Sequence, residues 1–313
     1  MSYELLRSGQ VWIEHDSTYY RLHTTRNVSF NQAFKQGGPQ KKTLHARKDL
    51  FKGSTIFEAN PANFSFELYM VDETTTHQHK PLDLLLNYSG NTLDTFNLYF
   101  YLPTTSADSD RTPAYYKITK CVFTEGSFKI PRKGIMTVSL SGSGSELQRF
   151  KNGSFLVDNN YDENPSFAVS RAYKVTVGSS ELDNILGASL QVQNSISWTK
   201  NTTVQATRAT TNADNTTYPQ NFTLTGRSLG GSIQQYISGA TNHAPNSANN
   251  QTWEQDTTIR IRAGLSSSNY QLDLNMPNAC SFTNRTNVQD IFSQNYDYRL
   301  MTNPSDLNTY FTY

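Results

Sequence analysis

Cysteine is scarce in this chain, because its 313 residues include only Cys121 and Cys280. Two cysteines are too few for a disulfide framework, so we expect small buried side chains, with a bridge or a reactive thiol as less favoured alternatives. Long hydrophobic runs are also missing, and none approaches the roughly 18 apolar residues that a membrane helix requires. The first residues lack the basic-then-apolar pattern of a signal peptide, so we expect neither membrane insertion nor export.

Charge of either sign is limited as well. Charged residues make up 17% of the chain and the net charge is +1, which points to neither nucleic acid nor a membrane surface as a binding partner. Residues 1–151 contain 18 Lys and Arg against 14 Asp and Glu, and the remainder contains 9 against 12. Opposite charges on the two halves could favour their alternation around a ring, although ordinary surface scatter explains the counts equally well.

Sequence motifs for catalysis or metal binding are lacking too. His77 and His79 are spaced so that both could face one side of a strand, but no ligands at suitable spacing support a zinc site, and a polar loop is the favoured interpretation. The glycine-rich segment 141–145 is not followed by the Gly-Lys-Ser/Thr of a phosphate-binding loop, and we expect a turn or bulge that closes a strand. We therefore predict no catalytic residues, no metal site and no cofactor, and a protein that is not an enzyme.

Alternating apolar and polar residues predict many short strands. The expected strands are residues 10–14, 19–23, 64–69, 97–102, 115–123 and 134–140 in the first half, and 172–177, 189–193, 221–225, 258–262, 270–274 and 296–300 in the second. Helical signal is limited to residues 80–88, where Pro81 suits a first turn and Gly90 a C-terminal cap, and to residues 232–237. The pattern predicts a mainly β protein with antiparallel sheets.

A faint repeat suggests that the chain contains two similar units. Residues 27–30, a long polar loop, residues 63–66 and the first helical segment are followed later by residues 194–198, another polar loop, residues 221–224 and the second helical segment. We predict two tandem antiparallel β-sandwich domains, 1–151 and 166–313, each with one short flanking α-helix, joined by an Asn- and Asp-rich linker at 152–165. Chance similarity is the alternative.

The most basic segment lies in the long loop of the first unit. It combines Lys35, Lys41, Lys42, Arg47, Lys48 and Lys52 with a single acidic residue, Asp49. Contact with a neighbouring subunit is the favoured interpretation, ahead of a solvated loop and of a grip on phosphates. No aromatic residues alternate with the basic ones, which argues against binding of single-stranded nucleic acid.

Three segments carry a resemblance to a known family. They are MSYELLRSGQVWI at residues 1–13, ITKCVFTEGSFKI at 118–130 and GIMTVSLSGSGSEL at 134–147. In this order, they resemble the duplicated, trimer-forming tail tube proteins of some siphophages. The resemblance extends to about residue 150, and beyond that only the order of elements persists.

The resemblance implies a structural role in a phage tail. Three two-domain chains would form a pseudo-hexameric ring, one sheet of each domain would help close a β-barrel around a lumen, and stacked rings would conduct double-stranded DNA into the host. The basic loop would be an arm that contacts the adjacent ring. The expected partners are copies of this chain and adjoining tail-tip and tail-terminator proteins, in a virion assembled in the bacterial host cytoplasm.

A β-sandwich module of a tail tip or fibre that binds host-surface glycans is the alternative function. Aromatic residues at Tyr19, Tyr20, Tyr115 and Tyr116 would then be ligand platforms, although packing between sheets is the favoured interpretation of these tyrosines.

Overall fold

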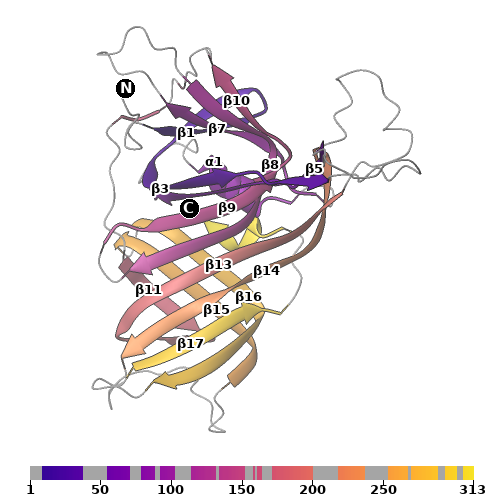
Figure 1. The fold of residues 1–313 in the computed structure, drawn as a ribbon. Coiled ribbons are helices and arrows are strands. Elements are labelled where there is room, and N and C mark those ends of the chain that lie inside the picture. Colours follow the sequence, from indigo (N-terminus) through magenta and orange to yellow (C-terminus); the bar gives the residue numbers. More distant parts are fainter. Residues whose placement is uncertain are drawn as a thin grey trace, which may run out of the picture.

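The computed structural model describes residues 9–37, 55–70, 79–88, 92–102, 114–131, 134–151, 158, 161–163, 171–199, 218–236, 253–266, 269–287, 293–301 and 306–313. The chain is mainly β, as predicted, and its strand pairs in these residues are antiparallel (Figure 1). The arm loop from 38 to 54 and the segment 71–78, which includes His77, lie outside the described residues.

The first half of the chain, β1 to β10, forms two packed layers. Its strands are β1 Gln10–His15, β2 Thr18–Leu22, β3 Thr24–Asn31, β4 Phe34–Gly37, β5 Thr55–Ala59, β6 Ala62–Tyr69, β7 Phe96–Leu102, β8 Ala114–Pro131, β9 Thr137–Gly144 and β10 Leu147–Lys151. One layer contains β2, β1, β7, β10 and the beginning of β8, and the other contains β3, β6, β9 and the end of β8. The long strand β8 therefore belongs to both layers.

The second half, β11 to β18, repeats this plan. Its strands are β11 Arg171–Val177, β12 Ser180–Glu181, β13 Ile185–Thr199, β14 Asn221–Tyr236, β15 Trp253–Ser266, β16 Asn269–Asn287, β17 Ser293–Leu300 and β18 Phe311–Thr312, the last preceded by the 3-10 helix η3 Asn308–Tyr310. Here the long strand β16 takes part in both layers, because β15 and β18 pair with its beginning and β17 pairs with its end.

Apart from the β4–β5 ribbon, every strand pairing described in the first half has a counterpart in the second. The pairs β1–β2, β1–β7, β7–β8, β8–β10, β8–β9, β9–β6 and β6–β3 correspond in order to β11–β12, β11–β15, β15–β16, β16–β18, β16–β17, β17–β14 and β14–β13. Such a repeated order is what a duplicated unit would produce. The predicted boundary at 152–165 stays a prediction.

The pairing register defines which residues correspond. Phe64 lies opposite Gly142, and Gly231 lies opposite Tyr298, so the counterpart of Phe64 is Gly231. The sequence motifs instead aligned Phe64 with Phe222, and that alignment is wrong by nine positions. The reason is that β13 and β14 are longer than β3 and β6, and Phe222 lies in their extension.

One further pairing joins the two halves. Strand β13 pairs with the end of β8, with Leu190 opposite Phe128 and Val192 opposite Gly126. The layer of the first half that contains β9 and the layer of the second half that contains β17 therefore form one continuous sheet of eight strands. Their order is β3-β6-β9-β8-β13-β14-β17-β16. We refer to it as the long sheet.

Period-two alternation directs one side of each strand of the long sheet into the core. On β6 the residues Phe64, Phe66 and Leu68 are buried while those between them are more exposed. In the second half the same holds for Leu229 and Ile233 on β14. A single buried hydrophobic cluster extends through both halves, and it includes both cysteines, which are buried as predicted.

The helix α1, Lys80–Leu86, confirms the first helical prediction, with Pro81 in its first turn. It lies against β8, and Leu85 and Leu86 are fully buried. The second helical prediction is wrong. Residues 232–236 belong to β14, where the odd-numbered Ile233 and Gln235 are buried and the residues between them are not. This two-residue period favours a strand.

The glycine-rich segment 141–145 is also not a turn, because residues 141–144 belong to β9. A Cβ atom on Gly142 would lie 2.3 Å from the carbonyl oxygen of Val122 and 2.4 Å from Cζ of Phe64. The glycine is therefore required by close packing within the strand. The bulge lies opposite it in β8, where the register shifts between Phe123 and Glu125.

Candidate functional site

The side of the long sheet that faces away from the core is the candidate functional surface, and we call it the polar face. Its residues alternate with the core residues along each strand, as the pleat requires. One row of paired positions crosses seven strands: Glu67, Ser139, Ser127, Gln191, Gly230, Arg299 and Ser281. A second row contains Tyr69, Thr137, Lys129, Ser189, Ser232, Asp297 and Thr283. Serine and threonine occupy three of the seven positions in the first row and four of the seven in the second.

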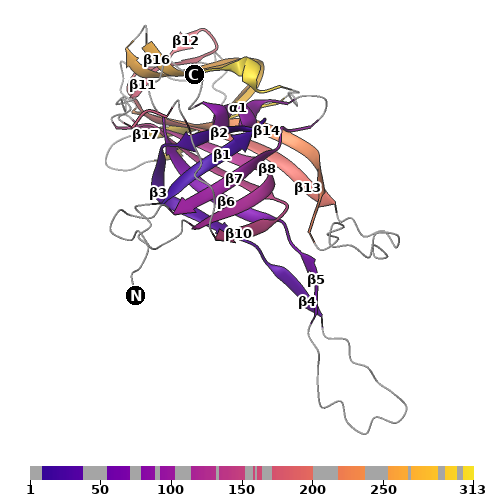
Figure 2. The same ribbon diagram turned by 90° about the horizontal axis from the view of Figure 1, so that it is seen from above.

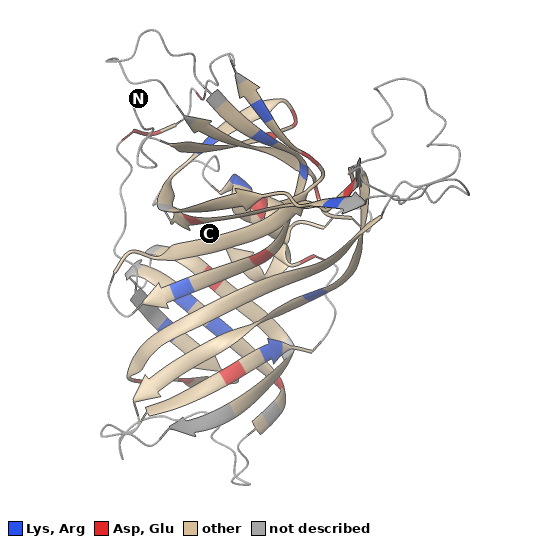
Figure 3. Ribbon diagram, in the orientation of Figure 1, with Lys and Arg blue, Asp and Glu red and all other residues tan. Residues whose placement is uncertain are grey.

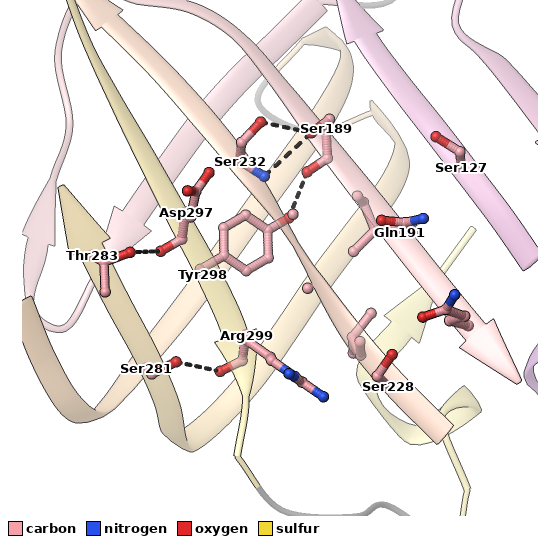
Figure 4. Close-up of a pocket in the computed structure, with 15 residues that line it drawn as sticks. Ser127, Ser189, Gln191, Ser228, Ser232, Ser281, Thr283, Asp297, Tyr298 and Arg299 are labelled. Carbon is pink, nitrogen blue, oxygen red and sulfur yellow. Dashed lines mark hydrogen bonds between the residues drawn. The ribbon is translucent and has the colours of Figure 1, made fainter. Parts of the chain in front are cut away.

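A depression of about 530 Å³ hollows the polar face over the second half. Figure 4 shows its lining, which comes from β8, β13, β14, β16 and β17 and includes Ser127, Ser189, Gln191, Ser228, Ser232, Ser281, Thr283, Asp297 and Arg299. A smaller depression of about 280 Å³ lies over the first half, lined by residues of β3, β6, β8 and β9. The face is thus open and polar along most of its length.

Hydroxyl pairs hold neighbouring strands together on this face. The Oγ atoms of Ser189 and Ser232 are 2.8 Å apart, and those of Ser29 and Ser65 are also 2.8 Å apart. These two pairs occupy corresponding positions of the two halves. Between the halves, the Gln191 side chain donates a hydrogen bond to Glu125 at 2.6 Å.

The charges on the polar face nearly balance. Among the described residues of the two rows and of Glu125, they are Glu67, Glu125 and Asp297 against Lys129 and Arg299, and most of the ribbon of these strands is uncharged (Figure 3). Burial raises the pKa of the Glu67 carboxyl, but hydrogen bonds from Asn27 and Thr25 outweigh it, so the pKa is lowered and the side chain stays ionised.

This chemistry suits a hydrated wall better than a binding pocket for an anion. A surface that retains nucleic acid concentrates Lys and Arg along the phosphates or offers aromatic rings for base stacking. Here Tyr296 and Tyr298 are buried, and the Tyr298 hydroxyl donates to the carbonyl oxygen of Ser189 at 2.9 Å. The aromatic residue in the two rows is Tyr69, which is half-buried at the end of the second row. The sequence signal for this face was available in the Ser, Thr and Gln residues that alternate with apolar ones along the strands.

The predicted contact arm is only partly described. Lys35 lies on β4, which pairs with β5 in a two-stranded ribbon that projects from the body of the molecule (Figure 2). Its Nζ atom is 3.6 Å from Oε2 of Glu58. Lys41, Lys42, Arg47, Lys48 and Lys52 lie outside the described residues, so the contact arm stays a prediction.

The four tyrosines considered as glycan platforms are each half-buried. Tyr20 and Tyr116 pack against the main core. Tyr19 and Tyr115 pack against a second, smaller cluster of Trp12, Tyr99 and Tyr101. The rings are therefore largely engaged in packing.

Helix α1 is held by residues of the second half. The Arg227 guanidinium donates to the carbonyl oxygens of Leu85 and Leu86 at 3.0 and 2.9 Å, and to the side chain of Asn194 at 2.8 Å. Burial lowers the pKa of Arg227 to about 10, which still leaves it charged at neutral pH. The Tyr313 hydroxyl bonds to Asp83, and the ring of Tyr313 lies 5.2 Å from that of His79.

The described ranges contain no group of three or more His, Cys, Asp and Glu residues placed to hold a metal ion. In the same part of the chain, no helix has the length and hydrophobicity to cross a membrane.

The beginning of the chain matches a known protein family. Residues 1–106 are similar to the bacteriophage baseplate tube protein family, and they make up about a third of the 313 residues. No curated protein matches the chain. The match relates the first third of the chain to structural proteins of phage tails and baseplates.

Proposed function

We propose that this protein is a structural subunit of a bacteriophage tail or baseplate tube. Three chains form a pseudo-hexameric ring, the polar face of the long sheet lines the lumen, and double-stranded DNA passes through the lumen on its way to the host. The rings stack, and the protein is a component of the virion. It acts without a catalytic residue, metal or cofactor.

The observation that carries this proposal is the long sheet. It spans both halves of the chain, buries one side in a core and presents a polar side whose charges nearly balance. A wall that conducts DNA must stay wet and must not hold phosphates, and such a face meets both needs. The similarity of residues 1–106 to the baseplate tube family supports the same role.

Electron microscopy of the purified protein tests this proposal. We expect rings or tubes with three-fold symmetry and a central channel, because a head-to-tail contact that closes gives a ring and one that does not close gives a filament. A protein that remains a monomer at high concentration, whatever the salt concentration, would contradict the proposed function.

The arm provides a second test, directed at stacking. Changing Lys41, Lys42 and Lys48 to Glu should abolish tube growth while rings still form, because like charges would replace attraction to an acidic surface of the adjacent ring. Changing the same residues to Arg is the matched control, since it keeps the charge. Sedimentation of tubes measures the effect, and normal growth of the Glu variant would remove the arm from the stacking contact.

A further inference from the structure

The joint between the two halves provides a pattern for the joint between chains. At the inner joint, β13 pairs with β14 on one side and with β8 of the first half on the other. Its counterpart β3 pairs only with β6 among the described residues. The same strand edge therefore occurs twice. In the second half it is paired with β8, and in the first half no described strand pairs with it.

The partner edge shows the same relation. The end of β8 pairs with β9 on one side and with β13 on the other. In the corresponding part of β16, residues 284–287 pair with β17 on one side, and on the other side the described part of β15 pairs only as far as Thr283. In the described part of the chain, the long sheet therefore ends in two open edges, β3 and β16.

Three independent features define which residues correspond in the two halves. The serine pair Ser29–Ser65 matches Ser189–Ser232. The thiols of Cys121 and Cys280 each donate to the carbonyl oxygen three residues earlier. Each half also places an aromatic residue opposite a glycine between its counterparts of β6 and β9.

We infer that β3 of one copy pairs antiparallel with residues 284–287 of β16 in a second copy, in the register of the β13–β8 joint. Replacing each residue of the inner joint by its counterpart places Asn31 opposite Arg285, Phe30 opposite Thr286 and Ser29 opposite Asn287. The inference rests on the proposed ring and specifies its contact. The occupant is a second copy because the polar face and the backbone ladder continue without interruption across such a joint.

The joint between chains is shorter than the inner joint. Thr283 of β16 is the counterpart of Glu125 of β8. At the inner joint Glu125 pairs with Gln193 of β13, whereas Thr283 already pairs with Trp253 of β15. The strand β3 can therefore begin to pair only after Trp253, whose side chain is 46% exposed at this edge. The inner joint also places Leu190 opposite Phe128, both buried, where the chain joint has Phe30 opposite Thr286. The ring should consequently open between chains before it opens between halves.

Cysteine cross-linking in a two-by-two design tests the register. Asn31→Cys and Ser29→Cys are each combined with Arg285→Cys and Asn287→Cys, and the four double variants are oxidised after assembly. Asn31 with Arg285 and Ser29 with Asn287 should give a ladder of linked chains on a non-reducing gel. The crossed combinations are displaced by two residues, roughly 7 Å along the strand, and should remain single chains.

Lys129→Cys with Ser189→Cys is the matched control, because these residues are paired at the inner joint and occupy the positions of Asn287 and Ser29. It should form a bond within one chain, which shows that this geometry permits cross-linking. Three-fold rings without a ladder would overturn the inference and leave the proposed function intact. Linking of the crossed pairs would overturn the register, and the absence of both rings and ladder would overturn inference and function together.

Discussion

The two halves of the chain solve one packing problem with opposite choices of residue. In the first half, Phe64 on β6 lies over Gly142 on β9. In the second half the aromatic residue is on the other strand, and Tyr298 on β17 lies over Gly231 on β14, where a Cβ would be 2.6 Å from the Tyr298 hydroxyl oxygen. In both halves, each pair combines one large aromatic side chain with one glycine. Packing constrains the summed volume of the two residues, and either strand can carry the aromatic residue.

The halves also differ in how each is held to the other. The first half contributes α1, whose terminal carbonyl groups accept hydrogen bonds from Arg227 of the second half. Because those carbonyls have no partner within the helix, a buried cation there both satisfies them and suits the helix dipole. The helix thus contacts the second half through hydrogen bonds as well as packing in the core of the first half.

The largest effect should come from Arg227→Met, which tests this asymmetry. The change leaves the Leu85 and Leu86 carbonyls without a charged donor in a buried site, so we expect a loss of about 3 kcal/mol in the free energy of unfolding. Urea unfolding monitored by circular dichroism measures it. Arg149→Met, at a position where the side chain is exposed and lies near Tyr116, is the control and should change stability little. Equal losses of stability in the two variants would contradict a particular role of the bonds between Arg227 and the helix.

A smaller effect, about 2 kcal/mol each, is expected for Gly142→Ala and Gly231→Ala. A Cβ on Gly231 would lie 2.0 Å from the carbonyl oxygen of Ser189, so the backbone itself must move. Gly226→Ala is the matched control, because nothing lies within 4 Å of a Cβ at that position. Thermal unfolding measures the stability of all three variants. Unchanged stability of both the Gly142 and the Gly231 variants would contradict the proposal that close packing requires glycine at these positions.

The smallest effect concerns an ion pair on the outer layer of the second half. The Asp273 carboxylate accepts hydrogen bonds from Arg260 at 2.7 and 2.9 Å and from Arg262 at 3.2 Å. Burial raises the pKa of Asp273, but the two arginines outweigh it and hold the pKa below its usual range. In the first half, the pKa of Glu14 is likewise lowered, since hydrogen bonds from Tyr99 and Asn97 and the charge of Lys117 outweigh its burial.

Asp273→Asn should cost about 1.5 kcal/mol at neutral pH, because the pair is partly exposed to solvent. A carboxylate with a lowered folded pKa stabilises the protein above its unfolded pKa and loses that contribution as the pH falls through the folded value. The difference between variant and wild type should therefore shrink below about pH 4. Unfolding measured between pH 3 and 7 tests this sign, and a difference that grows with acid would contradict it.

Much of the fold could be predicted from the sequence because period-two alternation is a local signal. Residues 64–69 and 296–300 alternate so clearly that both strands were predicted, and Pro81 indicated where α1 begins. Residues 232–237 are too short to separate a helix from a strand by composition alone, and only the pairing of β14 with β13 and β17 decides it. The correspondence of Phe64 with Gly231 was hidden because the aromatic residue changes strand between the halves.

The candidate surface was harder to predict than the fold. Lone serines such as Ser139 and Ser189 carry no motif, and they form a surface only when strands far apart in sequence are brought into register. The charges of the basic arm, in contrast, lie close together along the sequence. Residues that are close in sequence can be recognised as a group from the sequence alone. Residues that form a row across a sheet can be recognised only when the strand pairing is known.

If copies join through β3 and β16 as inferred above, the two ends of the long sheet determine the order of assembly. Any open string of copies joined through β3 and β16 carries one edge of each kind at its ends, so adding a copy never reduces the number of reactive ends. Only closure of the ring removes both, and the final step joins ends that are already tethered at a high effective concentration. Closed rings should therefore accumulate abruptly with concentration, while incomplete rings stay rare.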